Sequence, residues 1–175
     1  TIDGAYTYAN GDKYVGGFDQ DVKAGKGTYT YVDGSQYVGD FQNNRFDGQG
    51  TQTWGLESAF AGDVYSGAFS ADKPNGQGRY IFANGDQYAG SFKDGLFEGQ
   101  GTLSSALGDT YIGDFKAGVR YGKGTLNGAD GTKYTGDWMD DQQHGQGRYS
   151  YADGDQYAGA FQHGVQKGKG TLTLV

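Results

Sequence analysis

One short frame recurs seven times along the chain: a tyrosine, a glycine two residues later, and an aromatic residue two residues after that. Successive first tyrosines are 23 residues apart, except for one step of 28 residues from Tyr37 to Tyr65. A fixed period of this length is typical of repeat arrays, in which each unit packs only against its neighbours. The first tyrosines are Tyr14, Tyr37, Tyr65, Tyr88, Tyr111, Tyr134 and Tyr157.

Numbered from its tyrosine, a repeat has Gly at position 3, Phe or Trp at 5, and Gly at 12, 14 and 21. The chain begins within a repeat, because Gly4 aligns with the position-14 glycines, and we expect it to be a fragment of a longer protein. The predicted organisation is one continuous domain, a partial repeat over 1–13 followed by repeats over 14–36, 37–64, 65–87, 88–110, 111–133, 134–156 and 157–175.

Side-chain alternation predicts two strands in each repeat, with position 1 opposite 16, Gly 3 opposite Gly 14, and aromatic 5 opposite Gly 12. This register needs a first loop of two or four residues. The connection between repeats is then a three-residue turn such as Val32-Asp33-Gly34, with positive φ at its glycine. The fold class is therefore all-β, an elongated single-layer antiparallel array of hairpins with about 14 strands. The turn glycines are Gly11, Gly34, Gly62, Gly85, Gly108, Gly131 and Gly154.

The frame YxGxFxxxxxxGxGTxxxxxG resembles the MORN repeat (membrane occupation and recognition nexus), and seven copies in phase cover nearly the whole chain. The acidic residue common in that family at position 4 is present only in Asp40, Asp114 and Asp137. The family's usual tryptophan at position 5 occurs only as Trp138. The resemblance implies an adaptor or assembly segment without catalytic activity, or the membrane recognition from which the family takes its name.

The charge of the chain favours the first of these two functions over membrane recognition. The formal net charge is −7 and the pI is about 4.6, which disfavours nucleic acid and anionic lipid as partners. With no cysteine, the chain has neither disulfides nor thiolate metal sites, but its compartment stays open, with the cytoplasm as the default. No run of about 18 apolar residues and no charged leader followed by an apolar stretch is present.

Few residues suit catalysis or metal binding. Both histidines, His144 and His163, are expected in exposed hairpin loops. The position-4 aspartates are expected to point outward at repeat spacing, too far apart for paired carboxylate chemistry. Aspartates at position 22 offer either solvated turn caps or a row of Ca²⁺ ligands, and the first alternative fits the 23-residue period better. We therefore expect no enzyme activity, catalytic residue, metal site or cofactor. The position-22 aspartates are Asp12, Asp63, Asp86, Asp109 and Asp155.

A protein partner or a second copy of the chain is the expected ligand. The seven first tyrosines, together with the second-strand tyrosines, are expected to present an aromatic face with exposed ring edges. Leu56 and Phe60, in the insertion of repeat two, form a candidate contact loop. Leu172, Leu174 and Val175 form a candidate edge for self-association. The second-strand tyrosines are Tyr29, Tyr31, Tyr149 and Tyr151.

The alternative, a peripheral membrane module that binds phosphoinositides, needs concentrated positive charge. The fourteen lysines and arginines are spread among 21 acidic residues. Lys116, Arg120 and Lys123 are the one notable cluster, and they are the candidate residues for a lipid headgroup.

Overall fold

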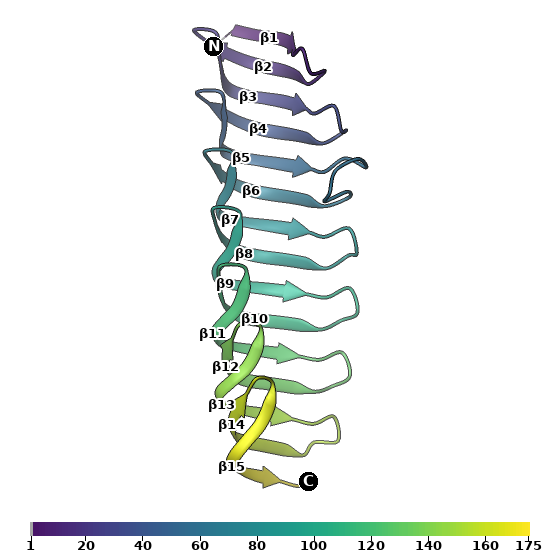
Figure 1. The fold of residues 1–175 in the computed structure, drawn as a ribbon, viewed down its shortest axis with the longest axis vertical. Helices are drawn as coiled ribbons and strands as arrows, with labels where there is room; N and C mark the ends of the chain where they lie inside the picture. Colours follow the sequence, from purple (N-terminus) through teal and green to yellow (C-terminus); the bar gives the residue numbers. More distant parts are fainter. Residues whose placement is uncertain (1) are drawn as a thin grey trace. The chain divides into compact units, whose positions relative to one another are not determined.

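The computed structural model describes residues 2–175, and within them it has fifteen β-strands and no helix. The strands follow one another in chain order in a single antiparallel sheet (Figure 1). The all-β hairpin array is confirmed, and the partial repeat adds β1 to the seven hairpins. The strands are β1 (Ile2–Thr7), β2 (Lys13–Asp19), β3 (Val22–Thr30), β4 (Gln36–Gln42), β5 (Arg45–Thr53), β6 (Val64–Ser70), β7 (Lys73–Ile81), β8 (Gln87–Lys93), β9 (Leu96–Ser104), β10 (Thr110–Lys116), β11 (Val119–Asn127), β12 (Lys133–Met139), β13 (Gln142–Ser150), β14 (Gln156–Gln162) and β15 (Val165–Thr173).

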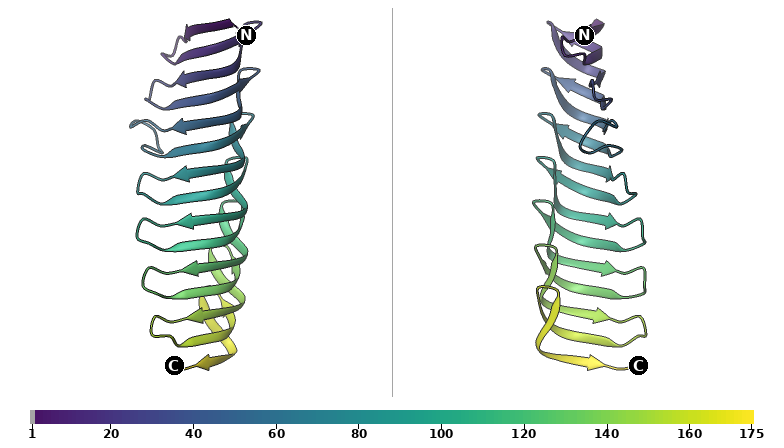
Figure 2. Two further views of the ribbon diagram at one scale, coloured as in Figure 1. Left: turned by 180° about the vertical axis from the view of Figure 1, so that it is seen from behind. Right: turned by 45° about the vertical axis from the view of Figure 1, so that its right-hand side comes forward.

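The chain divides into two compact units. The first reaches to Gly85 and takes in Phe92–Gly95, and the second comprises Asp86–Ser91 and Leu96–Val175. Within each unit, consecutive strands lie side by side, joined alternately by the loops inside and between repeats (Figure 2). The hairpin ends of the repeats bend away from the straight strand segments that lead to the connecting loops.

The loops between repeats have the expected form. In the first one, the Tyr31 N–H donates to the Ser35 carbonyl at 2.8 Å, and the Gly34 N–H donates back to the Tyr31 carbonyl at 3.1 Å. Gly34 has φ of 83°, a conformation that a β-carbon would strain. The prediction of positive φ is confirmed at all seven turn glycines, Gly11, Gly34, Gly62, Gly85, Gly108, Gly131 and Gly154.

The loop within each hairpin has two residues, one of the two lengths predicted. In repeat one, Asp19 pairs with Val22, and the intervening Gln20 and Asp21 have φ of 46° and 62°. Two consecutive positive φ values define a type I′ turn, whose twist matches that of the flanking strands. The hairpin turns therefore place residues other than glycine in the left-handed region.

The strand register agrees with the prediction from the connecting loop as far as the glycine pair, and departs from it between that pair and the hairpin turn. Tyr14 pairs with Tyr29 and Gly16 with Gly27, as expected. The expected pair of Phe18 with Gly25 is wrong, because the register shifts after Gly16 and Phe18 pairs with Lys23. Gly25 instead pairs with Phe41 of the following repeat. The aromatic residue at position 5 thus faces glycine 12 of the preceding repeat.

Glycine at position 12 makes this shift possible. Gly25 has φ of 75° and Gly48 has φ of 113°, so the second strand of each hairpin bulges at a residue that tolerates this backbone. In repeat two, the bulge leaves the Gln49 N–H outside the ladder, and the Asp40 carboxylate accepts it at 2.8 Å. Asp114 and Asp137 accept the equivalent N–H groups of Lys123 and Gln146.

The hairpin ends also join consecutive repeats. The Asn44 N–H donates to the Lys23 carbonyl at 3.1 Å, and the Asn44 side-chain oxygen accepts the Lys23 N–H at 2.8 Å. Asp72 forms the same two-way contact with Phe46 of the preceding repeat. These contacts continue the hydrogen bonding between repeats beyond the bulge, where the regular strand pairing has ended.

The core is a row of aromatic rings on one face of the sheet, which we call the inner face. Five of the first tyrosines, Tyr14, Tyr37, Tyr65, Tyr111 and Tyr134, pack edge to face against position 5 of their own repeat and of the next. For Tyr37, the ring centroids are 5.2 Å from Phe41 and 4.9 Å from Phe69. Phe46, at position 10, stacks on Tyr37 at 3.7 Å. Position 10 therefore lies in a strand, as Phe46 does in β5 and Pro74 does in β7.

Each first tyrosine lies over the glycine pair of its own hairpin. The Tyr14 hydroxyl donates to the Gly17 carbonyl at 2.8 Å, which draws the ring across Gly16 and Gly27. A β-carbon added to Gly27 would lie 2.5 Å from the Tyr14 ring, closer than side chains approach. The glycines at positions 3 and 14 thus leave room for the ring of the position-1 tyrosine.

Burial changes the acidity of these tyrosines. Removal from water, which disfavours the charged phenolate, raises the pKa of Tyr65, Tyr88, Tyr111 and Tyr134 to about 12. Burial likewise raises the pKa of Tyr14 and Tyr37 above the ordinary value. These six tyrosines therefore stay neutral until the pH is strongly alkaline.

The ring-on-glycine packing is tested by Gly27→Ala. Gly27 has ordinary backbone angles, so the new methyl group acts only by its collision with the Tyr14 ring. We expect the variant to lose about 1–3 kcal/mol of unfolding free energy, measured by urea unfolding followed by circular dichroism. Thr28→Ala, at the neighbouring outward position, is the control and should lose much less. An unchanged midpoint for Gly27→Ala would contradict the packing.

Candidate protein-interaction surfaces

The histidines and acidic residues form no metal-binding group in the part of the chain that the structure describes. Over residues 2–175, no group of three or more His, Asp or Glu side chains is arranged to hold a metal ion. His144 lies in β13 opposite Asp137, which corrects the expectation that it sits in a loop. His163 is in a hairpin loop as expected, with its Nδ1 3.2 Å from the Gln142 side-chain oxygen.

The position-22 aspartates tie each repeat to the next. The Asp12 Oδ1 accepts the Val32 N–H at 2.9 Å, and its Oδ2 accepts the Tyr29 hydroxyl at 2.8 Å. The Asp63 carboxylate accepts the Ala83 N–H and the Tyr80 hydroxyl in the same way. Asp12 and Asp63 are buried, so the expectation of solvated turn caps is wrong for these two. They are structural staples rather than ligands for an ion.

The same pattern continues in the second unit. Asp109 and Asp155 accept the N–H groups of Ala129 and Val175, each from the start of the next connection.

The hydrogen bond from Tyr29 is the largest of the effects that hold the pKa of Asp12 below its ordinary value. Where a leucine replaces the tyrosine, as Leu126 does, this second hydrogen bond cannot form.

The first tyrosines do not offer the exposed edges expected of them. Tyr14, Tyr37, Tyr65, Tyr88, Tyr111 and Tyr134 are at most 1 % exposed, and Tyr157 is 8 % exposed. The prediction of exposed edges is wrong for all seven, because they are packed into the core of the inner face, where Phe46, for example, stacks on Tyr37. The second-strand tyrosines are more accessible: Tyr29, Tyr31 and Tyr149 are half-buried and Tyr151 is exposed.

The candidate headgroup residues do not gather into one cationic patch. Arg120 lies on the inner face, 4.5 Å from the Trp138 ring centroid, and its Nε is 3.0 Å from the Asp141 carboxylate. Lys123 lies on the opposite face and pairs with Asp137. The Lys116 ammonium lies over the Tyr121 ring at 4.9 Å. Two of the three charges are thus matched by carboxylates of the following repeat.

The other candidate contact residues are exposed. In the insertion of repeat two, Leu56 is 92 % exposed, and Phe60 packs edge to face on Trp54. β15 is exposed along its length and no strand pairs with its outer side. Leu172, Leu174 and Val175 are also exposed. Their accessibility is compatible with the predicted contacts, which remain predictions.

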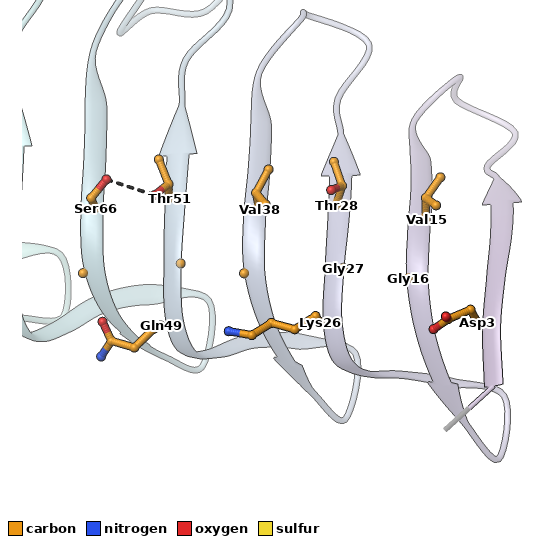
Figure 3. A pocket seen from close by; sticks show the side chains of 13 residues that line it. Asp3, Val15, Gly16, Lys26, Gly27, Thr28, Val38, Gln49, Thr51 and Ser66 are labelled. Carbon is orange, nitrogen blue, oxygen red and sulfur yellow. Dashed lines mark hydrogen bonds between the residues drawn. The ribbon is translucent and has the colours of Figure 1, made fainter.

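A shallow groove crosses the outer face of the first unit (Figure 3). Its floor is the backbone of glycines at positions 3 and 14, and its volume is about 760 Å³. One row of short side chains borders it, including Val15 and Val38, which are 58 % and 48 % exposed. A polar row with Lys26 and Gln49 borders the other side. Sequence reasoning missed this groove, because it placed the interaction on the aromatic face.

A second cavity, of about 410 Å³, lies on the inner face of the second unit. The sequence carried a signal for it, since Leu103 and Leu126 stand where repeats one, three and six have tyrosine. The smaller side chains leave space beside the buried Tyr111. The cavity is lined by Asp86, Leu103, Ser105, Asp109, Tyr111, Arg120, Leu126 and Asp141.

The model of one family, the MORN repeat, matches the chain in seven segments. The chain belongs to the MORN repeat family. The second MORN match ends at residue 55 and the third begins at residue 65, so the insertion lies between them. The matched segments are 14–36, 37–55, 65–87, 88–110, 111–133, 134–156 and 157–175.

Two solved structures are similar to this MORN array at low sequence identity. One is the TCP domain of SAS-4 from Drosophila melanogaster in complex with a proline-rich motif of Ana2, at 12 % identity and a TM-score of 0.49, over 99 % of this chain and 90 % of that chain. Another is the TCP10 domain of CPAP from Danio rerio in complex with a STIL peptide, at 14 % identity and a TM-score of 0.37, over 98 % and 77 %. A search among curated proteins gave no match. Within residues 2–175, no helix is long and apolar enough to cross a membrane.

The staple between MORN repeats is tested by Tyr29→Phe, which removes one hydrogen bond to Asp12. A carboxylate with a lowered pKa stabilises the fold above its unfolded pKa of about 3.9, and this contribution is lost as the pH falls through the folded pKa. The variant should be about 1 kcal/mol less stable at neutral pH, with the difference shrinking below about pH 4. Carboxyl NMR titration should show a higher pKa for Asp12.

Tyr31→Phe is the matched control, because the Asp12 carboxylate accepts no hydrogen bond from the Tyr31 hydroxyl. It should leave the pKa of Asp12 unchanged. If Tyr29→Phe also left that pKa unchanged, Asp12 would not be held by the tyrosine.

Proposed function

We propose that this MORN array is a non-catalytic scaffold that binds an extended segment of a partner protein. The observation that carries the proposal is the outer groove of the first unit (Figure 3). Its floor has no side chains, so the backbone of a partner can approach closely. Its rim combines exposed valines with polar groups, a mixture typical of non-obligate protein interfaces.

The groove also has the order expected of a repeat surface. Val15 and Val38 occupy position 2 of consecutive repeats, and Ser66 occupies it in the third. The Thr51 and Ser66 hydroxyls lie 2.9 Å apart, joined by a hydrogen bond across neighbouring strands. A segment lying across the strands would meet the same side-chain position once per repeat, which favours an extended partner over a compact ligand.

Self-association is the second form that the scaffold proposal takes. It is supported by the exposed β15 strand and by Leu172, which is 57 % exposed. An unpaired strand edge with apolar side chains readily pairs with another strand. Binding to phosphoinositide membranes has weaker support, because Arg120 and Lys123 face opposite sides and are paired with Asp141 and Asp137.

Capture experiments with matched variants test the proposal. The groove variant Val15→Glu/Val38→Glu introduces charge at two exposed positions without disturbing the core. The control is Ile112→Glu, at position 2 of a repeat in the second unit and 52 % exposed. We expect proteins captured from a lysate by the unmodified chain to be lost by the groove variant and kept by the control, as measured by quantitative mass spectrometry.

The same experiment includes a second, differently tagged copy of the chain and phosphoinositide vesicles. Capture of the second copy that Leu172→Asp/Leu174→Asp abolishes would support self-association through β15. Equal capture of every protein by the groove variant and the unmodified chain would contradict binding at the groove. Binding to the vesicles alone would favour the membrane alternative.

A further inference from the structure

The inner cavity of the second unit combines an apolar floor with a charged rim. Leu103 lies on β9 and Leu126 on β11, the second strands of consecutive repeats. The buried Tyr111 lies between them on β10. Asp109 lies at the rim near the connecting loops, and Asp141 lies at the rim formed by the hairpin ends. The cavity and the outer groove have no lining residue in common.

Another repeat of the same chain shows what fits such a space. In repeat one, position 16 is Tyr29, whose hydroxyl donates to Asp12 at 2.8 Å. The Lys23 ammonium lies 4.6 Å from the centre of the Tyr29 ring, and its charge contributes to the lowered pKa of Asp12. A ring and a cation therefore accompany the position-22 carboxylate there.

Beside Asp109 in the second unit, the tyrosine is replaced and the cation is engaged by another carboxylate. Leu126 takes the place of the tyrosine and has no hydrogen-bond donor. Arg120 takes the place of Lys23, but its guanidinium turns to Asp141, donating from Nε at 3.0 Å and from Nη2 to the Asp141 carbonyl at 2.8 Å. Asp109 uses Oδ1 to accept the Ala129 N–H at 2.9 Å. In the part of the chain that the structure describes, its Oδ2 accepts no hydrogen bond.

We propose that this cavity binds a lysine or arginine side chain from a partner protein segment. The aliphatic part of that side chain lies between Leu103 and Leu126, over the Tyr111 ring, and its cationic end reaches the Asp109 carboxylate. This arrangement supplies the cation that Lys23 provides in repeat one. The net charge of −7 favours a basic partner in the same sense.

Other occupants fit the cavity less well. An anion would face the carboxylates of Asp86 and Asp109, with the one nearby guanidinium already paired to Asp141. A purely apolar group would remove the Asp109 Oδ2 from water without supplying a hydrogen-bond donor, which is costly. A tyrosine side chain from a partner would imitate Tyr29, but it would leave the negative charge at the rim unbalanced, so we expect it to bind more weakly than a basic side chain.

The test uses methyl NMR of the intact chain, observing Leu103 and Leu126. The probe is the capped peptide acetyl-Gly-Ser-Arg-Ser-Gly-amide, compared with peptides in which citrulline or tyrosine replaces arginine. We expect saturable shifts of both leucines with the arginine peptide and much smaller shifts with citrulline, which has the same shape without the charge. Free arginine amide, added as a separate arm, should bind more weakly because it lacks the peptide main chain.

Two variants locate the binding. Leu126→Tyr fills the cavity with the residue found at position 16 in other repeats, so it should fold and abolish binding. Asp109→Asn keeps the acceptor for the Ala129 N–H and removes the charge, so it should weaken binding about two- to fivefold. Asp94→Asn makes the same charge change at an exposed hairpin turn of the first unit and should have no effect.

The outcomes separate this proposal from the scaffold proposal. Absence of saturable shifts, equal shifts with citrulline, tighter binding of the tyrosine peptide, or binding unaffected by Leu126→Tyr would each overturn the basic-side-chain site. None of these results would bear on Val15→Glu/Val38→Glu, which tests the outer groove. Conversely, loss of the groove interaction would leave the leucine shifts unchanged.

Discussion

A tyrosine ring lying flat over two paired glycines is the contact on which the rest of this structure depends. Tyr14 covers Gly16 and Gly27, and its hydroxyl is held by the Gly17 carbonyl. A single sheet has no second layer to bury its side chains. In place of a second layer, the tyrosine ring covers the backbone of its own hairpin. The bulge then brings the residue at position 10, such as Phe46, across the ring. Repetition joins these local clusters, because each tyrosine also packs against the aromatic residue of the next repeat.

Much of this arrangement could be predicted from the sequence, because it depends on period, parity and glycine chemistry. The pairs Tyr14 with Tyr29 and Gly16 with Gly27 follow from side-chain alternation, and the positive φ at Gly34 follows from a three-residue turn. The bulge could not be predicted in this way. Shifting the register by two residues keeps every side chain on its face, so the pattern is the same with or without it.

The candidate site was less predictable for the same reason. Once the bulge folds position 10 over the core, the first tyrosines are buried and cannot be contact residues. Lys23, Phe46 and Arg120 gain an inner position that their sequence context gives no reason to expect. The outer groove depends on the absence of side chains, which leaves little trace in a search for chemical groups. The cavity beside Leu126 does leave one, because it interrupts a tyrosine pattern.

These features describe a scaffold whose rigid part and variable part are different residues of the same repeat. The frame residues form the core and the turns. Positions 2, 10 and 16 vary between repeats and determine what each part of the surface offers. Val38 borders the outer groove, whereas Leu126 opens the inner cavity. On the scaffold proposal, specificity would change at one repeat without loss of the fold.

The most direct test of the central claim is a spectrophotometric titration of the fifteen tyrosines with rising pH. A group whose pKa is raised by folding stabilises the fold below its unfolded pKa of about 10, and that contribution is lost as the pH rises through the folded value. The account predicts that Tyr65, Tyr88, Tyr111 and Tyr134 ionise together with cooperative unfolding as the pH approaches about 12. Ionisation of all fifteen near pH 10, with the sheet intact, would contradict it.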